Sequence, residues 1–214
     1  MKILCINTAF SETYVAVLNE NQVITKKMDS SLKQSENVLG AVDYCLNNAN
    51  VNLNKLDAIA CVIGPGSFTG IRIGASLVKG FCQALPHIKK IEVNSLDLMA
   101  YEYLLANKPN NEFWVVLNGL SGNLFACKYS ANGKRLLEPM LCYGEELALI
   151  DGLVVGLECE KLEICNAYIN FSCHGLLNFV NSKIENDEYS QDFIPIYLRK
   201  SQAEAELANK NSNN

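Results

Sequence analysis

The feature that most restricts the fold of this chain is a change of hydrophobic period near residue 30. Before it, the apolar residues fall into three short runs separated by polar turns, at Lys2–Ile6, Tyr14–Leu18 and Val23–Met28. Connections this short predict neighbouring antiparallel strands. After it, apolar residues recur every three or four positions from Lys33 to about Asn50, which predicts a helix with one apolar stripe.

Strand and helix patterns then alternate as far as residue 106. We predict strands at Ala58–Ile63 and Ile88–Val93, a helix from Thr69 or Gly70 to Leu85, and a helix to Ala106 with Ser95 as its N-cap. An antiparallel meander followed by alternating helices and strands builds parallel strands flanked by helices. This order of elements is typical of a ribonuclease H-like domain.

The second half repeats the opening in a degraded form, after a polar segment at 108–111 that predicts a domain boundary. The elements expected there are strands at Phe113–Leu117, Leu124–Tyr129, Arg135–Pro139, Leu153–Val155 and Leu162–Cys165, a short helix at Gly144–Ile150, and a helix capped by Ser172 that runs to about Ile184. We therefore expect an α/β fold of two ribonuclease H-like domains, as in actin, Hsp70 and the sugar kinases, with the second eroded. The domains are expected at 1–107 and 108–200, followed by a partly disordered tail at 201–214.

Charge and composition argue against several classes of function. The 214 residues carry a formal net charge of -5 and no basic run, which disfavours a free-standing nucleic-acid-binding protein. No stretch approaches the roughly 18 apolar residues of a membrane span. Nine cysteines without a secretion signal predict free thiols in the cytoplasm. The nearest approach to a metal-ligand set, Cys159, Cys165, Cys173 and His174, fits no usual zinc spacing, so no metal site is expected.

A glycine-rich loop, GPGSFTGIRIG at residues 64–74, lies between a predicted strand and a predicted helix. It fits neither the Walker A loop, which needs a lysine, nor the dinucleotide fingerprint, which needs a glycine at Thr69. Gly70 and Gly74 stand one helical turn apart on one face, and each costs about 0.8–1 kcal/mol relative to alanine. The pair therefore predicts a close backbone approach, either within the chain or to another protein.

The loop and its surroundings resemble the signature of the bacterial TsaB (YeaZ) family. The likeness extends to Ile3–Thr8, to Gln34-Ser35-Glu36, to Val93–Leu96 and to Pro195–Arg199. The first 105 residues match well, and residues 112 to 190 match poorly.

The resemblance implies a non-catalytic subunit that supports a TsaD-type subunit, which places threonylcarbamoyl on adenosine 37 of tRNA. It further implies a TsaE-type ATPase as partner, a homodimer when the chain is alone, tRNA contact only through the complex, and ATP and a metal ion on the partner subunits rather than on this chain. By the same resemblance, the partner face lies on the first helix and on the helix after the glycine loop. Its residues would be Ser35, Glu36, Leu39, Val42, Asp43, Gly70, Ile71, Gly74, Leu77 and Val78.

Catalysis by this chain alone is not expected. Its two histidines, His87 and His174, are too far apart for the H-x3-H metal pair of TsaD-like enzymes. Asn7 stands where actin-like ATPases place a magnesium-binding carboxylate, and Asn118 stands where the family has an aspartate. Asparagine also suits turns, so both positions have a structural explanation as well.

An actin-like ATPase or a glycoprotease-like enzyme with its own turnover remains the alternative. Helix N-termini attract anions, so weak binding of a nucleotide or anion is a further option. Its contacts would be Asn7, Thr8, Gly64, Gly66, Ser67 and Thr69.

Overall fold

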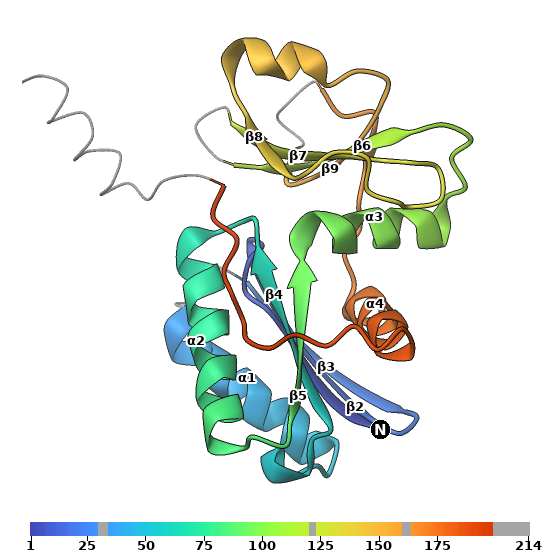
Figure 1. Ribbon diagram of the computed structural model, residues 1–214. Coiled ribbons are helices and arrows are strands. Elements are labelled where there is room, and N and C mark those ends of the chain that lie inside the picture. The colour runs from blue at the N-terminus through green and yellow to red at the C-terminus, as the bar shows by residue number, and fades with distance from the viewer. Residues whose placement is uncertain (30–33, 120–122, 160–163, 199–214) are drawn as a thin grey trace, which may run out of the picture.

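The computed structural model describes residues 1–29, 34–119, 123–159 and 164–198, and it contains two five-stranded sheets (Figure 1). The strands of the first sheet are β1 (Lys2–Asn7), β2 (Glu12–Asn19), β3 (Gln22–Asp29), β4 (Ala58–Gly64) and β5 (Lys89–Asn94). Their order is β3-β2-β1-β4-β5, with β2 antiparallel to its neighbours and β1, β4 and β5 mutually parallel. This is the predicted ribonuclease H-like arrangement.

The second sheet repeats this topology with shorter strands. Its strands are β6 (Phe113–Asn118), β7 (Leu124–Tyr129), β8 (Met140–Cys142), β9 (Leu153–Leu157) and β10 (Ala167–Tyr168). Their order is β10-β9-β6-β7-β8, which is the order of the first sheet when β6 takes the place of β1. The fold of two ribonuclease H-like domains is thus confirmed. The second domain is eroded in the sense that its edge strands, β10 and β8, have only two and three residues.

The helices form one layer outside the first sheet and one layer between the sheets. They are α1 (Gln34–Asn48), α2 (Phe68–Ala84), α3 (Ser95–Ala106) and α4 (Cys173–Glu185), with short 3-10 helices at Leu53–Lys55 and Gly144–Leu149. Figure 1 shows α1 and α2 on one face of the first sheet and α3 and α4 on the other. Because α3 also packs against β6 and β7, it lies between the two sheets.

The core follows from the two-residue period of the strands. In β1, Ile3 and Cys5 point toward α3 and α4, whereas Leu4 and Ile6 point toward α1 and α2, and all four are fully buried. A strand buried on both faces reads as a continuous apolar run, which is why it was visible in the sequence. Phe113 of β6 belongs to the same apolar cluster as Ile3, so one core joins the two sheets.

Two predicted strands of the second half are misplaced. The structure has β8 at Met140–Cys142 rather than at Arg135–Pro139, where Arg135 makes only an isolated bridge to Tyr129. β10 follows Cys165 instead of ending at it, while Leu162 lies outside the described residues. The Asn166 amide donates to the Val154 carbonyl at 2.8 Å, and its side-chain oxygen accepts from the Val154 amide at 2.7 Å, so Asn166 joins the chain to β9 just before β10.

One of the two predicted helix caps is wrong. The Asn94 side chain, not Ser95, accepts hydrogen bonds from the amides of Leu96 and Asp97, at 2.9 and 3.2 Å. Ser95 is the first helical residue, and its buried hydroxyl has no partner within the part of the chain that the structure describes. The Ser172 cap of α4 is confirmed, because its hydroxyl accepts from the Gly175 amide at 2.9 Å.

The chain returns to the first sheet after β10. α4 packs against α3, β1, β2 and β5, and the segment Ser190–Leu198, which we call the strap, then crosses beside β5 and α2 (Figure 1).

The predicted domain division at residue 107 falls in the connection between α3 and β6 and stays a prediction. The expected tail at 201–214 lies outside the described residues. No helix in the described ranges is long and apolar enough to cross a membrane.

Candidate functional site

The glycine loop connects the end of β4 to the start of α2, next to the end of β1. Ser67 is the N-cap of α2, and its hydroxyl accepts a hydrogen bond from the Gly70 amide at 3.1 Å. The Ser67 amide in turn donates to the carbonyl oxygen of Ala9 at 2.8 Å. The loop is therefore tied to the turn that follows β1.

The glycines of this loop admit the chain's own atoms. Gly64 has a φ of +107°, and a Cβ atom there would lie 2.7 Å from the carbonyl oxygen of Ile196 in the strap. The Ile196 amide donates to the Ile63 carbonyl at 2.8 Å, which holds the strap at this place. At Gly74 a Cβ atom would lie 2.5 Å from the Thr8 hydroxyl and 3.2 Å from the Cys61 sulfur. The close approach that the sequence predicted is thus internal.

Half of the residues predicted for the partner face are buried inside this chain, and the face itself stays a prediction. Side chains on the sheet-facing sides of α1 and α2 are buried in this chain's own core, so they cannot contact a partner; they are Val42, Gly70, Ile71, Gly74 and Val78. Of the remaining members that the structure describes, Glu36, Leu39 and Asp43 are exposed, with Leu39 at 48%. Leu77 is half-buried and packs against the edge of the core under α1 and α2. The side chain of Ser35 lies outside the described residues.

Sequence reasoning did not include Ile73, which lies one turn before Leu77 on α2 and is likewise half-buried at the edge of the core. The sequence could have revealed Ile73, because Ile73 and Leu77 are four residues apart and form a second apolar row on α2 beside the buried one. We define the α1–α2 face as Glu36, Leu39, Asp43, Ile73 and Leu77. It combines apolar side chains with acids from α1.

The predicted anion contacts are mostly occupied within the chain. The Asn7 side-chain oxygen accepts from the Ala9 amide at 2.9 Å, and the Thr8 hydroxyl donates to the Gly70 carbonyl at 2.6 Å. Asn7, Thr8 and Gly64 are buried, so a ligand cannot reach them in this structure. Gly66 is covered on one side by the Ala9 carbonyl. Ser67 and Thr69 are exposed, and their part in anion binding stays a prediction.

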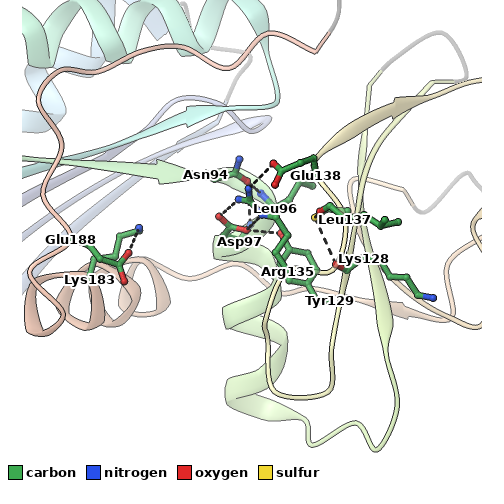
Figure 2. Close-up of polar contacts among 11 residues, drawn as sticks. Asn94, Leu96, Asp97, Lys128, Tyr129, Arg135, Leu137, Glu138, Lys183 and Glu188 are labelled. Carbon is green, nitrogen blue, oxygen red and sulfur yellow. Dashed lines mark hydrogen bonds and ion pairs between the residues drawn. The ribbon is translucent and has the colours of Figure 1, made fainter.

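An ion pair joins α3 to the second sheet (Figure 2). The Asp97 carboxylate accepts hydrogen bonds from the Tyr129 hydroxyl at 2.8 Å and from two guanidinium nitrogens of Arg135, one of them Nε at 3.2 Å. Burial, reinforced by the Asp97 charge, raises the pKa of Tyr129, so this hydroxyl stays a donor. The Arg135 guanidinium also reaches Glu138 at 3.2 Å.

A cavity of about 340 Å³ lies beside this ion pair, between α3, α4 and the turn at Asn132. Its charged groups are already paired: Arg135 with Asp97, and Lys183 with Glu188 at 2.8 Å. The region therefore reads as a structural junction between the two halves rather than as a ligand site.

A second contact between the halves closes the cleft near the β1–β2 turn. The Glu158 carboxylate, which follows β9, accepts a hydrogen bond from the Ser11 amide at 2.6 Å. The Phe171 ring lies edge-on against Phe10 and Tyr14, with centroid distances of 5.1 and 4.7 Å. Only about 250 Å³ is left in this cleft.

Comparison with known proteins assigns the chain to a family. The family model described as "TsaD: tRNA N6-adenosine threonylcarbamoyltransferase" matches residues 27–193, well over half of the chain. The chain belongs to the TsaD family. Within that family it is a member of the TsaB/YeaZ group, because curated relatives named TsaB match it, one of them over almost the whole chain.

The TsaB protein of Buchnera aphidicola is 25% identical over 92% of this chain and 97% of its own length. The Haemophilus influenzae TsaB is 30% identical, but the match covers 48% of this chain and 44% of that relative. The chain thus matches less than half the length of some curated relatives. The solved structure titled "YeaZ from Pseudomonas aeruginosa" has 21% identity and a TM-score of 0.77 over 92% of this chain and 99% of that one, a likeness of fold alone.

In this TsaB/YeaZ chain the candidate metal ligands do not gather. His87 and His174 are exposed, and the His87 ring lies 3.2 Å from the Asn54 carbonyl oxygen. No group of three metal-ligating side chains occurs in the described ranges. Eight of the nine cysteines are buried, and burial raises the pKa of Cys45 and of Cys61 to about 12, so these thiols are not reactive nucleophiles.

Proposed function

We propose that this chain is a non-catalytic TsaB-type subunit that supports a TsaD-type subunit in threonylcarbamoyl transfer to adenosine 37 of tRNA. The observation that carries the proposal is the end-to-end match to a protein named "tRNA threonylcarbamoyladenosine biosynthesis protein TsaB", over 92% of this chain and 97% of that relative. A match of such extent aligns both halves of the fold. ATP and a metal ion would be held by the partner subunits, and tRNA would be contacted through the complex in the cytoplasm.

The glycine loop supports a non-catalytic role. Phosphate-binding loops present free backbone amides to their ligand. Here the Ser67 amide bonds the Ala9 carbonyl, the Gly70 amide bonds the Ser67 hydroxyl, and the strap lies on Gly64. At the end of β1, the neutral side chain of Asn7 lacks the charge that favours a magnesium ion.

The α1–α2 face supports the partner role. It exposes Leu39 and half-exposes Ile73 and Leu77, which gives an apolar centre. Acids lie on α1, at Glu36 and Asp43, whereas α2 is a helix with cations and no acid. When two such helix pairs are related by a two-fold axis, α1 of one pair can face α2 of the other, so that acids lie opposite cations. A TsaD-type subunit with a related helix pair, or a second copy of this chain, would fit this surface, and a TsaE-type ATPase would join the assembly elsewhere.

Reconstitution of threonylcarbamoyl transfer to tRNA tests the proposal. A purified TsaD-type subunit with its other partners is assayed with this chain, without it, and with Leu39→Asp. We expect activity to require this chain and to fall at least roughly tenfold with Leu39→Asp, because a carboxylate would be desolvated at the centre of the face.

Leu149→Asp is the matched control, since Leu149 is 65% exposed in the second half of the chain. This variant is expected to support full activity. Undiminished transfer when the chain is left out would contradict the proposal. Saturable ATP hydrolysis by the purified chain alone would support the enzyme alternative instead.

A further inference from the structure

The strap is firmly attached to the first sheet at both of its ends. The Ser190 amide donates to the Lys90 carbonyl of β5 at 2.8 Å, and Ile196 donates to Ile63 at the end of β4. Between them the Phe193 side chain is fully buried in the core under α1 and α2. Asp192 also pairs with Lys79 of α2 at 3.1 Å. The strap is therefore a fixed part of the surface next to α2.

A stack of three side chains joins the end of the strap to the first turns of α2. The rings of Phe68 and Tyr197 have centroids 4.7 Å apart. The Arg72 guanidinium carbon lies 4.1 Å from the Phe68 centroid and 5.8 Å from the Tyr197 centroid. Arg72 also directs Nε toward the Tyr197 hydroxyl at 3.4 Å. Because Phe68 and Arg72 are four residues apart on one helix, the stack is built on a rigid element.

The Arg72 charge has no carboxylate partner within residues 1–29, 34–119, 123–159 and 164–198. Arg135, by contrast, is paired with Asp97, and Lys79 is paired with Asp192. The Arg72 guanidinium is exposed and is held in one orientation by two rings. An oriented guanidinium presents a planar set of donors that matches a carboxylate.

We propose that Arg72, stacked on Phe68 and Tyr197, binds a carboxylate of the TsaD-type subunit, so that the strap extends the α1–α2 face. The inference rests on the proposed function. Arg72 lies on α2, the helix that also carries Ile73 and Leu77 of that face, and Ile194 of the strap, 66% exposed, adds an apolar side chain. Arginine and tyrosine that are already ordered before binding lose little entropy in an interface, which is why such residues dominate binding energy.

A protein carboxylate fits this site better than an RNA phosphate. Proteins that bind the phosphate backbone gather several lysines and arginines on one surface. Here the other cation near the strap on α2, Lys79, is already paired, and the whole chain has a net charge of -5. Among the described residues of α2 and the strap, Arg72 is the one cation without a carboxylate partner, and an arginine held between rings is typical of an anchor between two proteins.

The test measures the affinity of this chain for a purified TsaD-type subunit by isothermal titration calorimetry, at low and high salt. Arg72→Gln is expected to weaken binding roughly tenfold or more and to flatten its salt dependence. Arg72→Lys keeps the charge but loses the planar stack, so its loss should be intermediate. Tyr197→Ala should weaken binding in the same direction. Lys55→Gln, which removes an exposed cation beyond α1, is the matched control and should bind like the natural chain.

The outcomes separate this inference from the proposed function. If the natural chain does not bind the TsaD-type subunit, both are overturned. If it binds and Arg72→Gln binds equally well, only the role of Arg72 is overturned. If Arg72→Gln lowers the affinity of the assembled complex for tRNA while the affinity between subunits stays the same, an RNA phosphate is the true ligand. Equal urea midpoints for all variants would show that the losses do not come from unfolding.

Discussion

Replacing Gly74 with alanine tests the internal role of the glycine spacing. A methyl group at this position would lie 2.5 Å from the Thr8 hydroxyl and 3.2 Å from the Cys61 sulfur, and all three residues are buried. Neither distance is compatible with an undisturbed core. The Thr8 hydroxyl would have to move, and it would then lose its 2.6 Å hydrogen bond to the Gly70 carbonyl.

The expected free-energy change has two opposing parts. Alanine in place of a helical glycine stabilises by about 0.8–1 kcal/mol. Overpacking costs about 1–3 kcal/mol, and a buried hydroxyl left without its partner costs about 1–3 kcal/mol. Gly74→Ala should therefore lower the free energy of unfolding by about 1–5 kcal/mol in all.

Gly80→Ala in the same helix is the control, because nothing lies within 4 Å of a Cβ atom there. It should raise stability by up to about 1 kcal/mol. Urea unfolding followed by circular dichroism measures both variants. In a Thr8→Ala background, Gly74→Ala should lower the free energy of unfolding by less, since the obstructing hydroxyl is gone. If Gly74→Ala proves as stable as Gly80→Ala, the close packing described for Gly74 is incorrect.

Three further predictions concern other parts of the molecule. Arg135→Met should lower the free energy of unfolding by about 1–3 kcal/mol by removing the charged donors of Asp97, and a thermal melt that matches the natural chain would contradict this. Burial raises the pKa of Glu102, although hydrogen bonds from Ser172 oppose this shift. The folded state therefore binds the Glu102 proton more tightly than the unfolded chain does. The free energy of unfolding should fall as the pH rises through the range in which this carboxyl titrates. In urea titrations, the free energy of unfolding of Glu102→Gln should therefore exceed that of the natural chain by more at about pH 7 than at about pH 4. Ellman's reagent should label at most one thiol quickly, that of Cys165, until denaturant exposes the eight buried ones.

The first half of the fold was predictable because its strands and helices carry strong patterns. β1 and β4 are buried on both faces, so each is an unbroken apolar run, and α1 shows one clear stripe. The second half was less predictable because β8 and β10 have three and two residues, too few for a period to appear. Just before β10 the side chain of Asn166 also bonds to β9, a contact that no apolar pattern reveals.

The candidate site was predicted only in part. The spacing of Gly70 and Gly74 indicated a close approach, which the structure shows at Gly74, but it could not identify the approaching group, because Thr8 is far away in sequence. Leu39 is exposed, as a residue of the partner face implied by the resemblance has to be, but its contact with a partner stays a prediction. The stack around Arg72 could not be predicted, because it is completed by Tyr197, whose place beside α2 depends on the return of the chain.

The return of the strap means that the second sheet is inserted within the first half of the molecule rather than appended to it. Phe193 fills a pocket under α1 and α2 that the preceding residues leave open, so a ribosome must have made nearly the whole chain before that core can close. A fragment ending at residue 107 would expose this pocket and the β5 edge to solvent. Fragments of this protein should accordingly be designed by excising the middle of the chain, with α3 rejoined to α4, and not by cutting it in two.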